Sequence, residues 1–284
     1  MKLIPGKNNP SMIVFPNAKI NLGLRITSKR PDGYHNLDTV FYPINLKDAL
    51  EIITDPDPLA NDVTFTSSGL SIPGSVSTNL CIKAYQLLKT KFPELPAIHM
   101  HLHKNVPMGA GLGGGSADGA FTLQLLNKKY KLNLGEEELI DMALALGSDC
   151  PFFIKNTPVH ATSRGEIMQS TFVDLSDKKI VLILPDIHVS TALAFKDCPI
   201  SSAIQTCDII TQQPVDAWKE LLINDFEQTV FPNYPALANI KAQLYDAGAV
   251  YASMTGTGST IFGIFNNAPE LNHIFSSEYQ VVYC

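Results

Sequence analysis

The sequence predicts an α+β protein with two lobes. Three observations lead to this fold class: strand-forming and helix-forming segments are mixed without strict alternation, several strands have one polar face, and 284 residues lie near the size at which single cores stop growing. Hydrophobic residues make up 45% of the chain, enough to offset the entropy lost on ordering it. We expect the first lobe to span residues 1–155 and the second residues 156–284.

The first half of the chain is expected to begin with strands. A strand from about Met12 places alternate apolar residues, ending near Ile26, on one face. Lys19 and Asn21 share the opposite face, where the pattern alone more often indicates a solvated surface. A turn at residues 30–33 leads into a β-rich stretch. Thr78 is then the expected N-cap of a helix, and a further strand with one wet face follows over residues 98–102.

The remaining elements follow a glycine-rich segment. Helices are expected at about 116–129 and 136–146, the second ended by Gly147. In the second half, strands are expected near 179–184, 251–254 and 260–265, and helices near 215–223, 236–246 and 269–276.

Charge and composition exclude several classes of protein. The formal net charge is −6 and no run of Lys or Arg is longer than two, so nucleic acid is not an expected partner. The N-terminus lacks the apolar core of a signal peptide and no apolar stretch is long enough to span a bilayer. The five cysteines show no C-x-x-C pair, which favours free thiols in a reducing compartment. We therefore expect a soluble, cytoplasmic protein that does not bind membranes.

The strongest local motif is the segment PMGAGLGGGSAD, residues 107–118, which has five glycines within seven residues directly before a helix. Glycine allows the backbone to approach a ligand closely, and a helix N-terminus offers unpaired N–H groups to an anion. The motif predicts a phosphate-binding loop. The alternative is a mobile surface loop or a tight turn.

Other phosphate-binding families fit this motif poorly. No Gly-Lys-Ser/Thr occurs in the chain, which excludes a P-loop NTPase. Gly109, Gly111 and Gly114 match the dinucleotide fingerprint, but the preceding strand alternates with histidines and no acidic residue follows at the required distance. Protein-kinase His-Arg-Asp and Asp-Phe-Gly segments are missing.

Four weaker features remain ambiguous from the residues alone. Asp149, directly after a predicted helix end, is a candidate general base or an Asx-turn residue. Lys19 and Asn21 are candidate polar site residues. The small-residue loop 253–260 could bind phosphate or form a hairpin turn. The histidines at positions 99, 101 and 103 fit the wet face of a strand better than a metal site, and no protein metal site is expected.

Together these segments resemble the GHMP small-molecule kinases. The N-terminal strand, the P-x-G-x-G-L-G-G-G-S loop and a C-terminal T-G-x-G loop match the three motifs of that superfamily in order. Residues 16–22 (PNAKINL) and 30–35 (RPDGYH) narrow the resemblance to the branch that phosphorylates a cytidine-diphosphate-linked methylerythritol in the non-mevalonate isoprenoid pathway. The implied fold has an N-terminal lobe like ribosomal protein S5 domain 2 and a ferredoxin-like C-terminal lobe.

The resemblance implies an ATP-dependent kinase that acts on the 2-hydroxyl of the polyol. Its small-molecule substrates would be ATP and the cytidine-diphosphate-linked polyol, with Mg²⁺ bound mainly through the ATP phosphates. Two alternatives stay open: another GHMP kinase with a mevalonate, homoserine or sugar acceptor, and a non-catalytic nucleotide-binding module. The segment Asp32 to His35 argues against the first, and Lys19 with Asp149 against the second.

The resemblance also implies roles for individual residues. Asp149 would accept the hydroxyl proton while Lys19 keeps that carboxylate ionised and stabilises charge on the phosphoryl group. Tyr34 and His35 would contact the cytidine, Phe195 would stack on the cytosine, Asn21 would lie by the methylerythritol, and Thr255 and Gly256 are further candidate substrate-binding residues. The ATP-binding residues would be Pro107, Met108, Gly109, Ala110, Gly111, Leu112, Gly113, Gly114, Gly115, Ser116 and Ala117, with Asn79 and Lys104 on the adenosine side.

Overall fold

The computed structural model describes residues 11–57, 62–271, 273–275 and 277–284, which divide into two compact units. The first unit holds the chain up to residue 18 with residues 46–108 and 113–156, and the second holds residues 19–45, 109–112 and 157–284. The last segment of the first unit ends at residue 156, and two segments earlier in the chain belong to the second unit. One of them, residues 19–45, is joined to the later chain because the strand at residues 35–47 pairs with a strand that follows residue 156.

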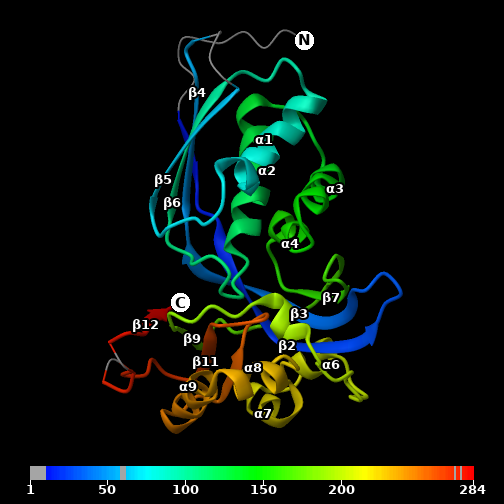
Figure 1. Cartoon of the computed structure of the whole chain (residues 1–284), viewed down its shortest axis with the longest axis vertical. Coiled ribbons are helices and arrows are strands. Elements are labelled where there is room, and N and C mark those ends of the chain that lie inside the picture. Colours follow the sequence, from blue (N-terminus) through cyan, green and yellow to red (C-terminus); the bar gives the residue numbers. More distant parts are fainter. Residues whose placement is uncertain (1–10, 58–61, 272, 276) are drawn as a thin grey trace. The chain divides into compact units, whose positions relative to one another are not determined.

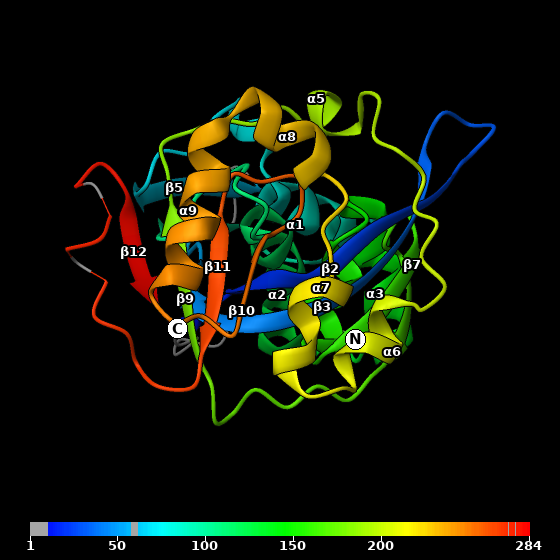
Figure 2. The same ribbon diagram turned by 90° about the horizontal axis from the view of Figure 1, so that it is seen from below.

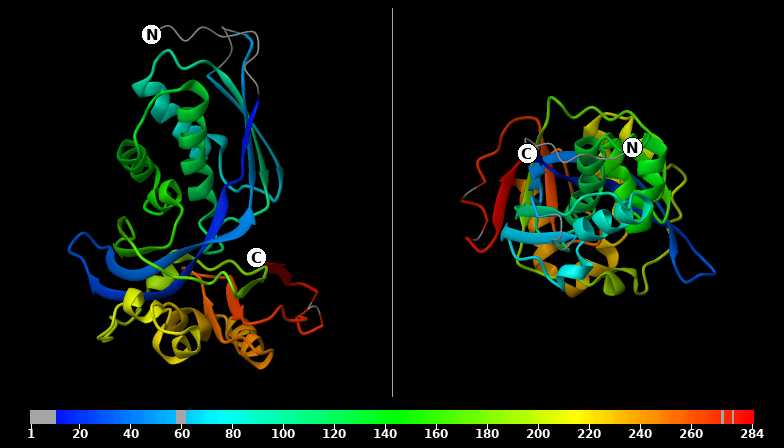
Figure 3. Two further views of the ribbon diagram at one scale, coloured as in Figure 1. Left: turned by 180° about the vertical axis from the view of Figure 1, so that it is seen from behind. Right: turned by 90° about the horizontal axis from the view of Figure 1, so that it is seen from above.

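The first unit is a four-stranded sheet with helices on one face (Figure 1). Its strand order is β1-β4-β6-β5, antiparallel except for the parallel pair β5–β6. Figure 3 shows the same sheet from behind, with its helices together on one side. The strands are β1 (Met12–Val14), β4 (Ala49–Thr54), β5 (Val63–Gly69) and β6 (Ile98–Lys104), and the helices are η1 (Val76–Thr78), α1 (Leu80–Lys91), α2 (Gly114–Tyr130), α3 (Glu136–Leu146) and α4 (Cys150–Lys155).

Strand β6 separates an apolar face from a polar one, as its alternating sequence predicts. Ile98, Met100 and Leu102 are buried, while the intervening histidines lie on the opposite face. The ring of His101 hydrogen-bonds the hydroxyls of Thr66 and Ser68 on β5. The interpretation of these histidines as the wet face of a strand is therefore confirmed.

The second unit contains two further four-stranded sheets, ordered β2-β3-β7-β8 and β10-β11-β9-β12. Helix α9 packs on β10 and β11, and Figure 2 shows α8 beside it. Leu24, Ile183, Phe226, Leu244 and Met254 belong to one buried apolar cluster. The elements are β2 (Asn17–Lys29), β3 (His35–Lys47), β7 (Val159–Ser163), β8 (Ile167–Ser170), β9 (Lys179–Leu184), α5 (Thr191–Phe195), α6 (Cys207–Thr211), η2 (Val215–Ala217), α7 (Trp218–Leu221), α8 (Glu227–Asn233), α9 (Pro235–Asp246), β10 (Tyr251–Met254), β11 (Ile261–Phe265) and β12 (Gln280–Tyr283).

The α+β class is confirmed, and several element boundaries fall where the sequence places them: 136–146, 179–184 and 251–254. The helix expected at 269–276 is wrong, because the described residues of that range form turns before β12. The N-cap of α1 is Asn79 and not Thr78, since the Asn79 side chain accepts the Cys81 N–H at 2.8 Å.

Two further properties follow from the described residues. All five cysteines are free thiols. None of the described helices has the length and apolar character needed to cross a bilayer.

A buried ion cluster joins the end of β6 to α2 in the first unit. The Lys104 ammonium has no exposed side-chain surface and lies 2.5 Å from Asp48 Oδ2 and 2.7 Å from Asp118 Oδ2. Asp48 Oδ1 also accepts the backbone N–H groups of Asn105 and Val106. The lysine therefore neutralises one of two carboxylates that are both shielded from water.

We expect Lys104→Met to lower the free energy of unfolding by roughly 3–5 kcal/mol, because it leaves two buried carboxylates without their cation. Urea denaturation followed by circular dichroism measures the change. Lys91→Met is the matched control, since Lys91 forms an exposed ion pair with Glu138 at 2.7 Å, and the expected loss there is below about 1 kcal/mol. Equal losses in the two variants would contradict the buried-cluster argument.

Candidate active site

Strand β2 places Lys19 and Asn21 inside the protein. Both side chains are almost fully buried, with 4% and 2% exposure, so the solvated-face interpretation of these residues is wrong. The alternation of β2 remains, but its polar face is covered as well as its apolar one. Buried polar groups require hydrogen-bond partners, and the structure supplies them from loops distant in sequence.

The Lys19 ammonium donates to two acceptors, Asn21 Oδ1 at 2.7 Å and the Gly111 carbonyl at 3.0 Å. It also lies 5.1 Å from the centre of the Phe41 ring. The Lys19 backbone N–H donates to the Leu112 carbonyl. Strand β2 and the first half of the glycine loop are thus joined through both the main chain and the side chain of one lysine.

Thr255, in the loop between β10 and β11, completes this junction. Its hydroxyl accepts the Asn21 N–H at 3.0 Å and lies within donating distance of Asn21 Oδ1 and of the Gly111 carbonyl. Thr255 is itself fully buried. The loop 253–260 is therefore the hairpin connection between β10 and β11, and it also anchors the glycine loop.

Gly111 is required by the close approach of these two loops. Its φ is +79°, and a Cβ at this position would lie 2.0 Å from the Thr255 carbonyl oxygen. Gly256 lies against it on the other side, where an added Cβ would come within 3.1 Å of Gly111 Cα. No side chain larger than hydrogen fits between the loops without a backbone shift.

The second half of the glycine loop starts α2 in the first unit. Gly113 is the N-cap with φ +70°, and the first helical hydrogen bond runs from the Ala117 N–H to the Gly113 carbonyl. The N–H groups of Gly114, Gly115 and Ser116 precede that bond at the positive end of a 17-residue helix. This geometry suits an anionic ligand.

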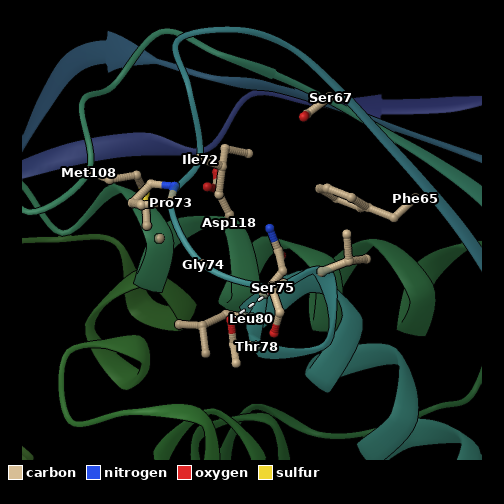
Figure 4. Close-up of a pocket in the computed structure, with 13 residues that line it drawn as sticks. Phe65, Ser67, Ile72, Pro73, Gly74, Ser75, Thr78, Leu80, Met108 and Asp118 are labelled. Atoms are coloured by element: carbon tan, nitrogen blue, oxygen red, sulfur yellow. Dashed lines mark hydrogen bonds between the residues drawn. The ribbon is translucent and has the colours of Figure 1, made fainter.

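A pocket of about 210 Å³ lies beside this helix start, within the first unit (Figure 4). Gly115 and Met108 of the glycine loop line it together with Asn79 and Asp118. Asn79 uses Oδ1 to cap α1, which leaves its Nδ2 as a donor for a ligand. Lys104 does not line this pocket but holds Asp118, which does. The other lining residues are Phe65, Ser67, Ile72, Pro73, Gly74, Ser75, Val76, Thr78 and Leu80.

Asp149 belongs to the first unit, in the short connection from α3 to α4. It is half-buried and is the N-cap residue of α4, followed by Cys150 and Pro151 in the first turn. A carboxylate is electrostatically unfavourable near the C-terminus of a helix, such as that of α3, and favourable at the N-terminus of the next helix, α4. The second effect offsets the first at Asp149.

The second unit brings the rings of His35 and Phe195 together, and Tyr34 precedes His35 in the chain. The rings of His35 and Phe195 stack with centroids 5.0 Å apart, and the Phe195 ring meets Phe226 edge-on at 4.7 Å. Tyr34 is 57% exposed, with the Arg164 guanidinium 5.2 Å from its ring centre. An exposed phenol ring is a surface on which a planar base can stack.

Two arginines hold Tyr34 and its turn through contacts that the sequence did not predict. Arg30 binds the Asp32 carboxylate with Nε and one terminal nitrogen, and its other terminal nitrogen donates to Asn36 and Ser163. This holds the turn that carries Tyr34. Arg164 comes from the β7–β8 turn, more than one hundred positions away, and no local pattern connects it with Tyr34.

The fold and glycine loop place the chain in a recognised class. Its residues 79–156 match the GHMP kinases N terminal domain and residues 213–277 match the GHMP kinases C terminal domain. Mevalonate kinase from Methanococcus jannaschii shares the fold, with a TM-score of 0.71 at 14% identity over 98% of both chains. The class defined by fold and motifs is therefore that of the GHMP kinases.

Closer relatives identify one branch of that class. The protein named 4-diphosphocytidyl-2-C-methyl-D-erythritol kinase from Cytophaga hutchinsonii is 51% identical over 95% of this chain and 98% of its own. The protein of the same name from Bacteroides fragilis is 49% identical over 96% and 98%. A crystal structure of 4-(cytidine 5'-diphospho)-2C-methyl-D-erythritol kinase has a TM-score of 0.74 at 27% identity, covering 89% of this chain and 90% of that one. The chain belongs to the 4-diphosphocytidyl-2-C-methyl-D-erythritol kinase family.

We expect Gly111→Ala to destabilise the protein by at least ~2 kcal/mol, because alanine is strained at positive φ and its methyl group meets the Thr255 carbonyl. Gly135→Ala is the matched control, since a Cβ there meets nothing within 4 Å and its φ is −73°. Urea denaturation of both variants gives the comparison. A Gly111→Ala protein as stable as the control would show that the two loops do not constrain each other.

Proposed function

We propose that this protein transfers the γ-phosphoryl group of ATP to the 2-hydroxyl of 4-diphosphocytidyl-2-C-methyl-D-erythritol, giving the 2-phosphate and ADP in the non-mevalonate route to isoprenoid precursors. The observation that carries the proposal is the 51% identity to a kinase of that name over 95% of this chain. The relatives at 51% and 49% identity are both named for this acceptor and not for mevalonate, homoserine or a sugar. The free thiols are consistent with action in the cytoplasm.

In this proposal Asp149 is the general base. It accepts the proton of the 2-hydroxyl as that oxygen attacks the γ-phosphorus, while the bond from phosphorus to the oxygen shared with the β-phosphate breaks and ADP leaves. Lys19 is the cation for the phosphoryl group, since an ammonium can stabilise charge that develops on the phosphoryl oxygens. Its contacts with Asn21 and Gly111 support this role by fixing its position.

The nucleotide would bind along the glycine loop and α2. The N–H groups at the start of α2 suit the phosphates, and the pocket bordered by Asn79 and Gly115 suits the adenosine. Mg²⁺ would be held chiefly by phosphate oxygens, with the Ser116 hydroxyl as a candidate protein ligand, and would neutralise charge on the transferred group. The loop glycines fit such a ligand because they leave the backbone free of side chains.

The cytidine end of the acceptor would bind at Tyr34, His35 and Phe195. A cytosine ring is planar and can stack on the exposed Tyr34 or on Phe195, and the imidazole of His35 can hydrogen-bond its polar edge. Asn21, Thr255 and Gly256 were expected to contact substrate. Because Asn21 and Thr255 are buried and hydrogen-bonded to each other, we propose that they act by positioning Lys19.

A panel of acceptors tests the substrate. In a coupled assay of ADP release we expect turnover with the cytidyl-linked methylerythritol, and none with free methylerythritol, mevalonate, homoserine or galactose. Activity confined to one of the last three would refute the proposed acceptor and leave the kinase class intact. ATP binding without turnover on any acceptor would instead support a non-catalytic module.

Asp149→Asn tests the base, because the amide cannot take the hydroxyl proton. We expect kcat to fall by at least ~10² while the circular dichroism spectrum is unchanged. Asp141→Asn makes the same chemical change at an exposed position on α3 and should keep full activity. A kcat for Asp149→Asn near that of the control would remove Asp149 from the mechanism.

A further inference from the structure

Asp118 has one carboxylate oxygen that the protein leaves without a partner. The residue is 3% exposed, and Oδ2 accepts from the Lys104 ammonium at 2.7 Å. Oδ1 is buried and has no hydrogen-bond partner among the described residues. An unsatisfied buried acceptor is costly to the folded state, so its retention in a pocket wall points to a ligand.

The position of Asp118 limits which portion of a bound nucleotide can contact it. It lies three residues, about one helical turn, beyond Gly115, so it is further along α2 than the N–H groups suited to phosphate. A carboxylate would repel phosphates. Apolar parts of the surrounding walls come from Phe65, Ile72, Pro73 and Leu80, which Figure 4 shows with Asp118. Apolar walls with a single anionic acceptor suit a flat, uncharged base that carries an N–H donor.

We propose that Asp118 Oδ1 accepts a hydrogen bond from the 6-amino group of the purine and thereby selects adenine over 6-oxopurines. The inference rests on the proposed use of ATP and adds the residue that reads its base. Adenine has one exocyclic donor group, the 6-amino group, whereas hypoxanthine has an acceptor at the same carbon. A 6-oxopurine would place its oxygen against a carboxylate oxygen, and two acceptors repel.

Lys104 is a positioning residue in this arrangement. Its ammonium can only donate, so it holds Oδ2 and leaves Oδ1 without a partner. Burial raises the pKa of Asp118 to about 7, with Asp48 adding to the shift and Lys104 opposing it. Nucleotide binding should therefore be measured near pH 8.5. This is about one unit or more above that pKa, so the Asp118 carboxyl group is ionised.

The substitution Asp118→Asn should reverse the selectivity. Because Lys104 requires an acceptor, the amide oxygen would face the ammonium and the amide NH₂ would replace Oδ1 in the pocket wall. The pocket would then present a donor where it had an acceptor. The change also leaves Lys104 paired with Asp48 alone, one cation to one anion, so the variant is expected to fold.

The experiment measures the dissociation constants of ATP, inosine triphosphate and purine riboside triphosphate by calorimetry, without acceptor. The wild-type protein should bind ATP at least about tenfold more tightly than inosine triphosphate, with purine riboside triphosphate between them, and Asp118→Asn should shift the ratio at least about tenfold toward the inosine nucleotide. Ser67→Ala, which alters another polar residue of the same pocket, should leave the ratio unchanged.

Two results would overturn the inference while ATP still binds. One is wild-type affinity for the three nucleotides that agrees within about threefold, which needs no variant. The other is an Asp118→Asn ratio of ATP to inosine triphosphate affinity equal to that of the wild type. Loss of the proposed function would look different: ATP would not bind at all, or the cytidyl-linked acceptor would not be phosphorylated.

Discussion

The hydrogen bonds of Thr255 set the geometry of the second unit's polar site. One residue joins strand β2, the first half of the glycine loop and the β10–β11 connection, because its hydroxyl lies within hydrogen-bonding distance of Asn21 and Gly111. Those two residues also accept hydrogen bonds from the Lys19 ammonium. The lysine is therefore oriented by the same atoms that hold the loops together, and its position is fixed before any ligand arrives.

A second buried polar cluster supports the other half of the glycine loop, in the first unit. Lys104, Asp48 and Asp118 connect the end of β6 with α2, and Gly114 packs so closely that an added Cβ would lie 3.0 Å from Lys104 Nζ. Each half of the glycine loop is thus supported by a polar cluster in its own unit. Buried charges are poor sources of stability compared with well-packed apolar groups. Their placement on both halves of one loop is better explained by the need to orient the backbone of that loop.

Local sequence was a good guide to the elements and to the glycine loop. The spacing of apolar residues gave the limits of α3, β9 and β10, and five glycines before a helix indicated an anion-binding turn. Local sequence gave the wrong prediction where contacts with distant segments decide whether a residue is buried or which structure it adopts. The polar face of β2 looks solvent-exposed by its pattern, yet loops far along the chain cover it. The apolar residues at 269–276 suggested a helix, but the described part of that range forms turns leading into β12.

The sequence by itself determined the fold class, the glycine-rich motif and the family, because these depend on residue types at short, fixed spacings. Only the tertiary structure decided which polar residues are exposed, which are paired and which have an unused hydrogen-bonding atom. Asp118 illustrates the difference: in sequence it is one polar residue in the first turns of a helix, and in the fold it is a buried carboxylate with one oxygen held by Lys104 and the other unpartnered. Such properties arise from contacts between distant segments, and no local pattern records them.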